Sequence, residues 1–549
     1  MIKIILSSFL VTALYTPFGI YFHKGNNLSS FTLQHIFGLI IISFFALFLN
    51  FFFPLYPLLN SLFLLINLII IFKFRKIYLS KNYFIFCSFS ALIIFLLITN
   101  SNMYRPDAGL YHLPYINLLN EEKIIIGISN LHFRFGHISI LQYLSAFTNN
   151  LLFNVNGIVF AGALIASSII INFLNQIYLG IKNKNFNFHF LFIFSILIFI
   201  FYKMNRFSEY GNDAPAHFLM FLLVSEIIKN FYNVNVKDIP NYFLISIFII
   251  MNKVILIASI LFPFIFFIKK KIKFNQINIK ILFVIFFLAF WSIKNILVSG
   301  CFLYPLNITC LDSLKWSDLE KTKQVSTENE AWAKGWPDFR KKKTNILQSE
   351  YSNNFLWLKT WTNNHFVIIL KILIPYIIFL AFILLFLKDG KIKFKLNNYI
   401  KLTSLISLIG ILMWFYKVPV FRYGYSFIII FISLIFASIG SRIFLKKNKD
   451  IIFKNLIAIC LIIFTVKNLN RILFENKNYY NYPWPKFYSY NNDNKIIKNE
   501  YKIINNKKIY MPLEGYCMYS KAPCGNINKN LNIKINNSYL FMIIDSKKL

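Results

Sequence analysis

Long apolar runs alternate with short polar segments along most of the chain. Many of these runs reach about twenty residues, enough for a helix to cross the roughly 30 Å hydrocarbon core of a bilayer. The runs cover 2–21, 31–53, 55–72, 83–99, 151–178, 187–202, 214–230, 240–268, 281–299, 365–387, 398–416, 420–443 and 451–467. The pattern predicts an all-α polytopic transmembrane protein with about 12–14 helices.

Composition excludes the main alternatives to a membrane protein. Of the 549 residues, 57% are hydrophobic and only 14% are charged, and the mean hydropathy is +0.58. Soluble domains are about a quarter charged, so a soluble globular enzyme and a disordered polymer are both excluded. The sequence also has no Walker loop, no dinucleotide fingerprint after a strand and no serine-hydrolase elbow. Nucleotide hydrolysis and cytosolic cofactor chemistry therefore have no support.

The net charge of +37 is explained by topology. Lys and Arg collect in the cytoplasmic loops of membrane proteins, so we expect no nucleic-acid partner. The segments rich in these residues are predicted to be cytoplasmic: 73–76, 182–185, 229–238, 269–280, 388–396 and 442–449. The loops 100–150, 203–213 and 300–364 and the tail 472–549 then fall together on the opposite side.

This assignment gives a domain organisation. Residues 1–471 are predicted to form the transmembrane domain, and 472–549 a small α/β or β-containing extracytoplasmic domain, because the tail has short alternating patches typical of strands. The run 240–268 is too long for one span, and both of its ends are assigned to the cytoplasm. We therefore expect a helical hairpin that turns near Asn252 and Lys253.

Cysteine positions indicate the compartment. Cys301 and Cys310 lie in one outer loop, and Cys517 and Cys524 lie close together in the tail. These are the pairs expected if the outer side is an oxidising periplasm, with four unpaired thiols as the alternative. The protein is accordingly expected in a bacterial inner membrane, with its active side facing the periplasm.

Acidic and histidine side chains gather in the first outer loop, although the chain has only 21 acids and 8 histidines. Asp107 stands where the chain leaves the membrane. A carboxylate there is suited to act as a general base for an acceptor hydroxyl, or as a metal ligand. A helix cap or a salt bridge with Arg105 is the structural alternative.

Three other positions carry candidate chemistry. Asp213 and His217 lie one helical turn apart, and with Asp107 they are a candidate site for a divalent cation, although Asp213 also suits a helix cap. Lys253 and Arg422 are two cations near the outer interface, suited to a phosphate or pyrophosphate. Snorkelling of both side chains to the interface is the alternative.

These features resemble GT-C-type glycosyltransferases, which take a sugar from a polyprenyl-phosphate carrier on the outer face of the membrane. The resemblance rests on Asp107 and Asp213 in outer loops, the hairpin that carries Lys253, and Arg422 near a late helix start. Closer similarity is to an uncharacterised family of bacterial multipass proteins, through four stretches: DAGLYH at 107–112, GISNLHFR at 127–134, NILVSGCFLYP at 295–305 and CMYSKAPC at 517–524. The chain departs from many GT-C enzymes in having a single acid at Asp107 rather than a pair.

The resemblance implies a function. A sugar would move from a polyprenyl-phosphate donor to a glycan, lipid or protein acceptor outside the cytoplasm, with Asp107 as catalytic base. The candidate substrate-binding residues are Tyr111, His112, Glu122, His132, Arg134, Arg206, Asp213, His217, Lys253 and Arg422. A transporter or flippase of a lipid-linked glycan, and a non-catalytic polymer-assembly protein, are the alternatives. The enzyme is favoured because no internal repeat is visible.

Overall fold

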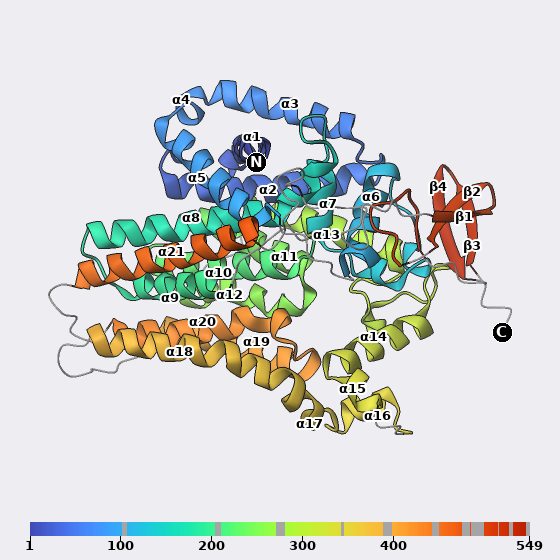
Figure 1. The fold of residues 1–549 in the computed structure, drawn as a ribbon. Helices are drawn as coiled ribbons and strands as arrows, with labels where there is room; N and C mark the ends of the chain where they lie inside the picture. The colour runs from blue at the N-terminus through green and yellow to red at the C-terminus, as the bar shows by residue number, and fades with distance from the viewer. Residues whose placement is uncertain are drawn as a thin grey trace.

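The computed structural model describes residues 1–100, 107–203, 210–270, 280–341, 345–387, 398–441, 449–474, 484, 499–513, 515–525 and 531–544. Most of these residues are helical, and the strands all lie near the C-terminus. Figure 1 shows a group of long helices that run side by side, with the strands and a set of short helices beyond one end.

The N-terminal helices form one layer of the bundle. Polar side chains fix where two of them begin: Asn27 accepts a hydrogen bond from the Ser30 N–H before α2, and Ser80 accepts one from the Tyr83 N–H before α5. The helices are α1 (Ile2–Tyr15), α2 (Leu28–Asn50), α3 (Pro57–Lys73), α4 (Arg75–Tyr78) and α5 (Lys81–Ile98).

The middle of the chain supplies further helices of the bundle, and the first four of them are largely buried. These are α8 (Phe160–Lys182), α9 (Phe188–Lys203), α10 (Asp213–Asn230), α11 (Ile239–Asn252), α12 (Leu261–Lys270) and α13 (Lys280–Ser299). They are followed by α18 (Val367–Leu387), α19 (Asn398–Lys417), α20 (Phe421–Gly440) and α21 (Lys449–Phe474). On α18, large apolar side chains such as Ile378, Phe382 and Leu385 face outward, which suits contact with lipid.

Eight helical segments in the described part of the chain are long and apolar enough to cross a membrane. They are Ile2–Tyr21, Leu28–Asn50, Lys81–Ile98, Asn154–Lys182, Lys280–Ser299, Trp357–Leu387, Asn398–Lys417 and Phe421–Gly440. This is fewer than the 12–14 expected from the sequence. Some apolar runs form shorter helices, such as α3 and α9, and α10 carries three charged residues, Asp213, Glu226 and Lys229.

The predicted hairpin in 240–268 is confirmed. Helix α11 ends at Asn252, Lys253 has extended backbone angles, and a short 3-10 segment, Val254–Ile260, leads into α12. The hydroxyls of Ser246 and Ser259 lie 3.2 Å apart across the two arms. The chain therefore reverses at Lys253, which stands at the apex.

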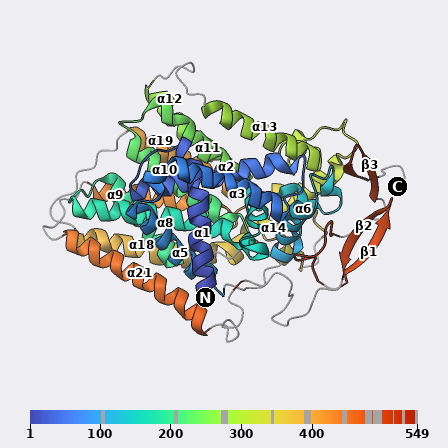
Figure 2. The same ribbon diagram turned by 90° about the horizontal axis from the view of Figure 1, so that it is seen from above.

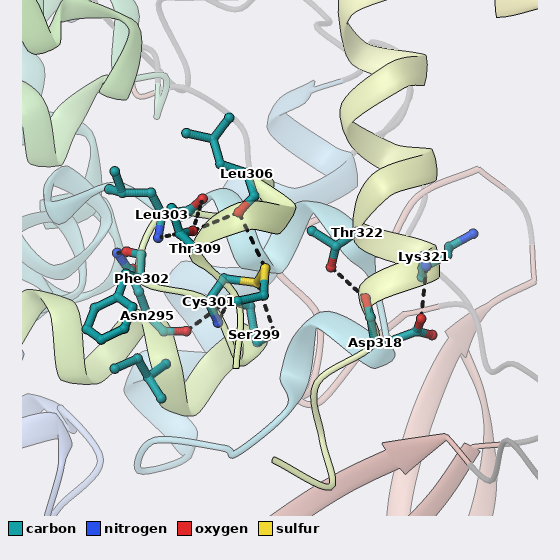
Figure 3. The surroundings of a disulfide bond; sticks show 12 residues. Asn295, Ser299, Cys301, Phe302, Leu303, Leu306, Thr309, Asp318, Lys321 and Thr322 are labelled. Atoms are coloured by element: carbon teal, nitrogen blue, oxygen red, sulfur yellow. Dashed lines mark hydrogen bonds between the residues drawn. A yellow bond between two sulfur atoms is a disulfide. The ribbon is translucent and has the colours of Figure 1, made fainter. Parts of the chain in front are cut away.

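Two segments cover the end of the bundle where the hairpin turns, and we call them the first and second outer segments after the side predicted for them. The first contains α6 (Leu113–Glu121) and α7 (Ile140–Thr148), and the second contains α14 (Leu319–Ala333), α15 (Trp336–Arg340), α16 (Gln348–Asn353) and α17 (Trp357–Trp361). A disulfide joins Cys301 to Cys310 where α13 gives way to the second segment (Figure 3). Beside it, the Cys301 N–H donates to the Ser299 hydroxyl at 3.3 Å and the Thr309 hydroxyl donates to the Leu306 carbonyl oxygen at 2.7 Å.

Two antiparallel hairpins make up the β region. Strand β1 (Asn499–Ile504) pairs with β2 (Lys507–Pro512), and β3 (Leu531–Asn536) pairs with β4 (Tyr539–Ile544). Both lie at the same end of the bundle in the two views (Figure 1, Figure 2). Between them, a disulfide joins Cys517 to Cys524, as the sequence predicted.

That disulfide loop, residues 517–524, packs on the segment that follows Asp107. The Met518 N–H donates to the Gly109 carbonyl oxygen at 2.9 Å, and a Cβ atom at Gly109 would lie only 2.1 Å from the Met518 sulfur. The Tyr519 hydroxyl donates to Asn120 at 3.0 Å. The tail is therefore in direct contact with the first outer segment.

Candidate functional site

Five charged residues from distant parts of the sequence meet at the covered end of the bundle: Asp107, Arg134, Asp213, Lys253 and Arg422. We call them the charged cluster. Their side chains are 18% to 45% exposed, so they are neither buried nor fully solvated. Three cations against two carboxylates leave the cluster with one net positive charge.

Lys253 and Asp213 form the tightest pair of the cluster, a direct hydrogen-bonded ion pair. Lys253 projects from the hairpin apex, and Asp213 is the first residue of α10. The preceding residues are also joined, because the Asn212 side chain donates to the Asn252 carbonyl oxygen. This bond sets the two backbones at the separation that the ion pair needs.

Arg422 bridges the two carboxylates. Its Nη2 lies 3.5 Å from Asp107 Oδ2, and its Nε lies 3.8 Å from Asp213 Oδ2. The same Nη2 donates to the Tyr423 hydroxyl at 2.8 Å, and the Lys253 ammonium lies 3.8 Å from the centroid of the Tyr423 ring. Tyr423 therefore separates the two cations and contacts both.

The backbone that carries Arg422 is held by side chains from other helices. Trp361 Nε1 donates to the Pro419 carbonyl oxygen at 2.6 Å, and Trp414 Nε1 donates to that of Val420 at 2.8 Å. His217 Nε2 lies 2.9 Å from the Arg422 carbonyl oxygen, which only accepts, so this nitrogen carries a proton. Side chains from three other helices thus hold the start of α20 in place.

Arg134 approaches Asp107 from the first outer segment. Its Nη1 lies 4.0 Å from Asp107 Oδ1, and its guanidinium lies 5.1 Å from the centroid of the Tyr111 ring. His132 Nδ1 accepts from the Arg134 backbone N–H at 3.3 Å and so orients the residue that carries this cation. Tyr111, His132 and Arg134, all singled out from the sequence, therefore lie together.

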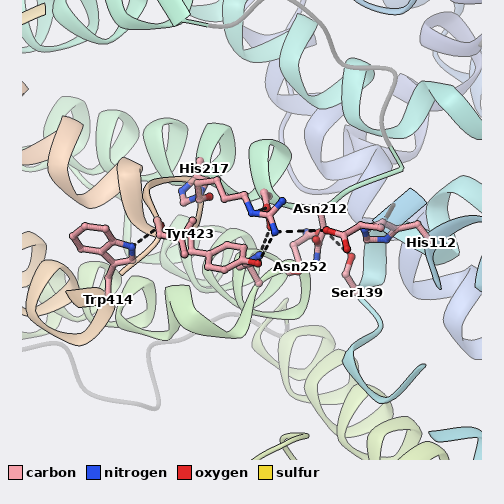
Figure 4. Close-up of polar contacts among 12 residues, drawn as sticks. His112, Ser139, Asn212, His217, Asn252, Trp414 and Tyr423 are labelled. Atoms are coloured by element: carbon pink, nitrogen blue, oxygen red, sulfur yellow. Dashed lines mark hydrogen bonds and ion pairs between the residues drawn. The ribbon is translucent and has the colours of Figure 1, made fainter. Parts of the chain in front are cut away.

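His112 lies beside the cluster and contacts Gln142 of α7. Its Nδ1 is 2.6 Å from Gln142 Nε2. Figure 4 shows His112, Ser139, Asn252, Asn212 and Tyr423 along one row of polar side chains. This row is the immediate support of the charged cluster.

The electrostatics of the site follow from burial and charge. Burial lowers the pKa of His112 and of His132 to about 4 each, so both rings are neutral at pH 7. Burial alone raises the pKa of Asp213, but the charges of Lys253 and Arg422 outweigh it and hold the pKa below its usual value. Asp213 is therefore ionised.

Two further candidate residues, Glu122 and His217, make their contacts outside the ion pairs of the charged cluster. Glu122 forms an ion pair with Lys507 of β2 and thus ties the first outer segment to the tail. His217 has both ring nitrogens engaged, Nδ1 with the Ser426 hydroxyl at 2.7 Å and Nε2 with the Arg422 carbonyl oxygen. Arg206 lies outside the described residues.

Among the residues that the structure describes, Asp107, Asp213 and His217 do not come together as the expected divalent-cation site. Within the described ranges there is no group of three or more His, Cys, Asp or Glu side chains that could hold a metal ion. Cations stand between Asp107 and Asp213, and His217 has no free nitrogen to offer. The two acids are neutralised by side chains instead.

Sequence reasoning missed Tyr423, Asn212, Gln142 and Lys294. Lys294 of α13 is fully buried, with its ammonium 3.6 Å from the centroid of the Trp291 ring and 3.4 Å from the Ile138 carbonyl oxygen. Lys253 was singled out because it is a single lysine inside an apolar run, and Lys294 could have been found in the same way. Tyr423 follows Arg422 and Asn212 precedes Asp213, both of which were singled out. No feature of the sequence points to Gln142.

A family model described as a domain of unknown function, DUF8201, matches residues 1–429. The match covers more than half of the chain and includes all five residues of the charged cluster. The chain belongs to the DUF8201 family. No curated protein and no solved structure matches the chain. The DUF8201 region ends within α20, so the β hairpins and the disulfide loop lie beyond it.

Proposed function

We propose that this DUF8201 protein is a membrane glycosyltransferase that moves a sugar from a polyprenyl-phosphate donor to a glycan, lipid or protein acceptor. The observation that carries the proposal is the charged cluster itself. Residues that lie up to about 300 positions apart in the sequence meet at one end of an apolar helical bundle, with three cations and two carboxylates in contact.

The cations suit the phosphate of the donor. Arg422 and Arg134 present planar guanidinium groups, which bind phosphate oxygens through paired hydrogen bonds, and Lys253 adds a point charge. When the sugar leaves, negative charge grows on the phosphate oxygen, and cations already in place stabilise that charge without rearrangement. A net positive charge at the cluster favours the same ligand.

Asp107 is better placed than Asp213 to act as the base. Asp213 is bonded directly to Lys253, whereas the oxygens of Asp107 stand 3.5 Å and 4.0 Å from their cations, beyond hydrogen-bond length. A phosphate that binds Arg134 and Arg422 competes for the partners of Asp107. The carboxylate is then free to accept a proton from a hydroxyl.

The reaction is a single displacement at the anomeric carbon of the sugar. The acceptor hydroxyl oxygen bonds to this carbon while its proton passes to Asp107. The bond from the carbon to the phosphate oxygen breaks, and its electron pair stays on the phosphate beside Lys253 and Arg422. The configuration at the carbon is inverted. We place this reaction on the periplasmic face of a bacterial inner membrane, in line with the charge distribution of the loops.

Transfer by the purified protein tests the proposal. Wild type and Asp107→Asn are reconstituted with a panel of polyprenyl-phosphate sugars and candidate acceptors, and product is measured. Loss of a general base costs roughly 10²–10⁴ in rate, and the variant is expected to show that loss. Asp338→Asn is the matched control, because Asp338 is an exposed acid of α15 that pairs with Lys341, outside the cluster.

Two outcomes would contradict the proposal. Equal product from wild type and Asp107→Asn would remove Asp107 from the catalytic role. No product from wild type across the donor panel, together with movement of a lipid-linked sugar between leaflets, would favour a transporter instead.

A further inference from the structure

The orientation of the Gln142 side chain is fixed by the start of α7. Ser139 is the residue that precedes the helix, and its backbone N–H lies 2.9 Å from Gln142 Oε1. A backbone N–H only donates, so the amide oxygen of Gln142 must face it. The NH₂ group of Gln142 therefore points the other way.

The NH₂ group of Gln142 in turn fixes the tautomer of His112. It lies 2.6 Å from His112 Nδ1 and only donates, so Nδ1 must be the unprotonated, accepting nitrogen. Burial keeps the pKa of this ring at about 4, so the ring is neutral at pH 7 and carries one proton. That proton is on Nε2.

The Nε2–H of His112 has no acceptor among the residues that the structure describes. His112 is only 6% exposed, so its ring is held in place while the Nε2–H remains available to a ligand. The Nε2 atom faces Gly211, where an added Cβ would lie 3.9 Å from it. Gly211 stands two residues before Asp213, so the free N–H is directed at the edge of the charged cluster.

We propose that Gln142 is a positioning residue that holds His112 as the Nε2–H tautomer, so that His112 donates a hydrogen bond to a phosphate oxygen bound beside Lys253 and Arg422. The proposal rests on the proposed function for the nature of the ligand, a phosphate. A neutral donor adds a directed hydrogen bond to the anion and leaves the charge balance of the cluster unchanged. Gln142 acts only through His112.

Gln142→Glu is the decisive variant because it reverses the donor pattern without changing size. A carboxylate accepts from Ser139 N–H and also from His112, so Nδ1 takes the proton and the lone pair of Nε2 faces the ligand. Nitrogen-15 spectra of histidine-labelled protein report which nitrogen is protonated. The chain has 8 histidines, and the His112→Asn variant identifies the signal. The wild type is expected to show a protonated Nε2 and Gln142→Glu a protonated Nδ1.

Binding is measured with two probes, inorganic phosphate and a short-chain isoprenyl phosphate, which distinguish a free phosphate from a lipid headgroup. Loss of a hydrogen bond to a charged group weakens binding by roughly tenfold or more, and this is expected for both Gln142→Glu and His112→Ala. In the His112→Ala background, Gln142→Glu is expected to add no further loss. Gln324→Glu, on exposed α14, controls for the added charge.

The outcomes test separately the role of Gln142, its action through His112 and the identity of the ligand. A wild-type ring protonated on Nδ1, or unchanged phosphate affinity in Gln142→Glu after its tautomer has switched, overturns the role of Gln142. A full further loss from Gln142→Glu in the His112→Ala background shows that Gln142 does not act through His112. Wild type with the expected tautomer but no affinity for either probe overturns the phosphate assignment and the proposed function with it.

Discussion

At the residue scale, the site is a balance of charges that neutralise one another at short range. Asp213 depends on Lys253 most directly, and the two side chains are 26% and 18% exposed. A partly buried carboxylate that loses its cation keeps its desolvation cost without compensation. The strength of this dependence is measurable.

Lys253→Met is therefore expected to destabilise the protein by about 1–3 kcal/mol, because Asp213 is left without its closest partner. Adding Asp213→Asn is expected to restore most of that stability. Thermal unfolding of the purified single and double variants in detergent measures both effects. A double variant that is less stable than wild type by the sum of the two single losses would show that the pair does not interact energetically.

The neutral state of His112 has a consequence for pH. Its pKa of about 4 lies below the 6.5 of an unfolded histidine, so the unfolded chain binds a proton first as the pH falls. Stability is full above pH 6.5 and is lost between pH 6.5 and pH 4. At pH 5 the expected loss from this residue is about 2 kcal/mol. His112→Asn keeps the acceptor for Gln142 and is expected to reduce the drop in melting temperature between pH 7 and pH 5; an unchanged drop would contradict this.

At the scale of elements, the disulfide loop 517–524 supports the segment that follows Asp107. Besides the contact of Met518 with Gly109, Asn117 of α6 donates to the Ser520 carbonyl oxygen at 2.6 Å, and the Ala522 N–H donates to Glu121 at 2.8 Å. Residues 1–429, which the DUF8201 model matches, therefore do not include all of the segments that support the charged cluster.

Breaking this disulfide is expected to loosen the Asp107 segment. The Cys517→Ser/Cys524→Ser variant should increase hydrogen exchange in 108–121 by roughly tenfold or more, since a disulfide contributes about 2 kcal/mol. Cys301→Ser/Cys310→Ser is the matched control and should raise exchange near 295–310 instead. Equal protection of 108–121 in both variants would show that the loop does not support the site.

The elements also show which structural features a local sequence pattern predicts and which it does not. The hairpin at Lys253 followed from run length and flanking charge, both local properties, and it is present in the structure. Of the 12–14 helices expected, eight in the described residues are long and apolar enough to span a membrane, because hydropathy does not reveal where an apolar run breaks into shorter helices. The ion pair of Glu122 with Lys507 could not be foreseen, because the two residues lie nearly four hundred positions apart and nothing local indicates such a contact.

At the scale of the whole molecule, the outer segments and the β hairpins gather at one end of the bundle, as the distribution of Lys and Arg led us to expect (Figure 1). The sequence grouped Asp107 with Asp213 as candidate cation ligands and Lys253 with Arg422 as candidate phosphate ligands, but it did not predict that the acids pair with these cations. Their mutual contacts depend on helix packing, which a single sequence does not encode in any local pattern. Arg134 became part of the cluster by the same packing.

The topology can be tested with introduced cysteines, because Cys87 and Cys460 are buried and the other four are paired. Asn354→Cys, after α16, is expected to react with a membrane-impermeant maleimide in intact spheroplasts. Asn183→Cys, just after α8, is expected to react only after the membrane is opened, because the Lys-rich segment there is assigned to the cytoplasm. The reverse labelling pattern would show that the topology is opposite to the one assigned, with the charged cluster on the cytoplasmic face.

A structure of the protein with a polyprenyl-phosphate sugar bound would test most directly whether the charged cluster is a glycosyltransferase site. We expect density for the phosphate within hydrogen-bond distance of Lys253 and Arg422, with the anomeric carbon of the sugar turned toward Asp107. A phosphate bound at another part of the molecule, with the ion pairs of Asp107 and Asp213 unchanged, would contradict it.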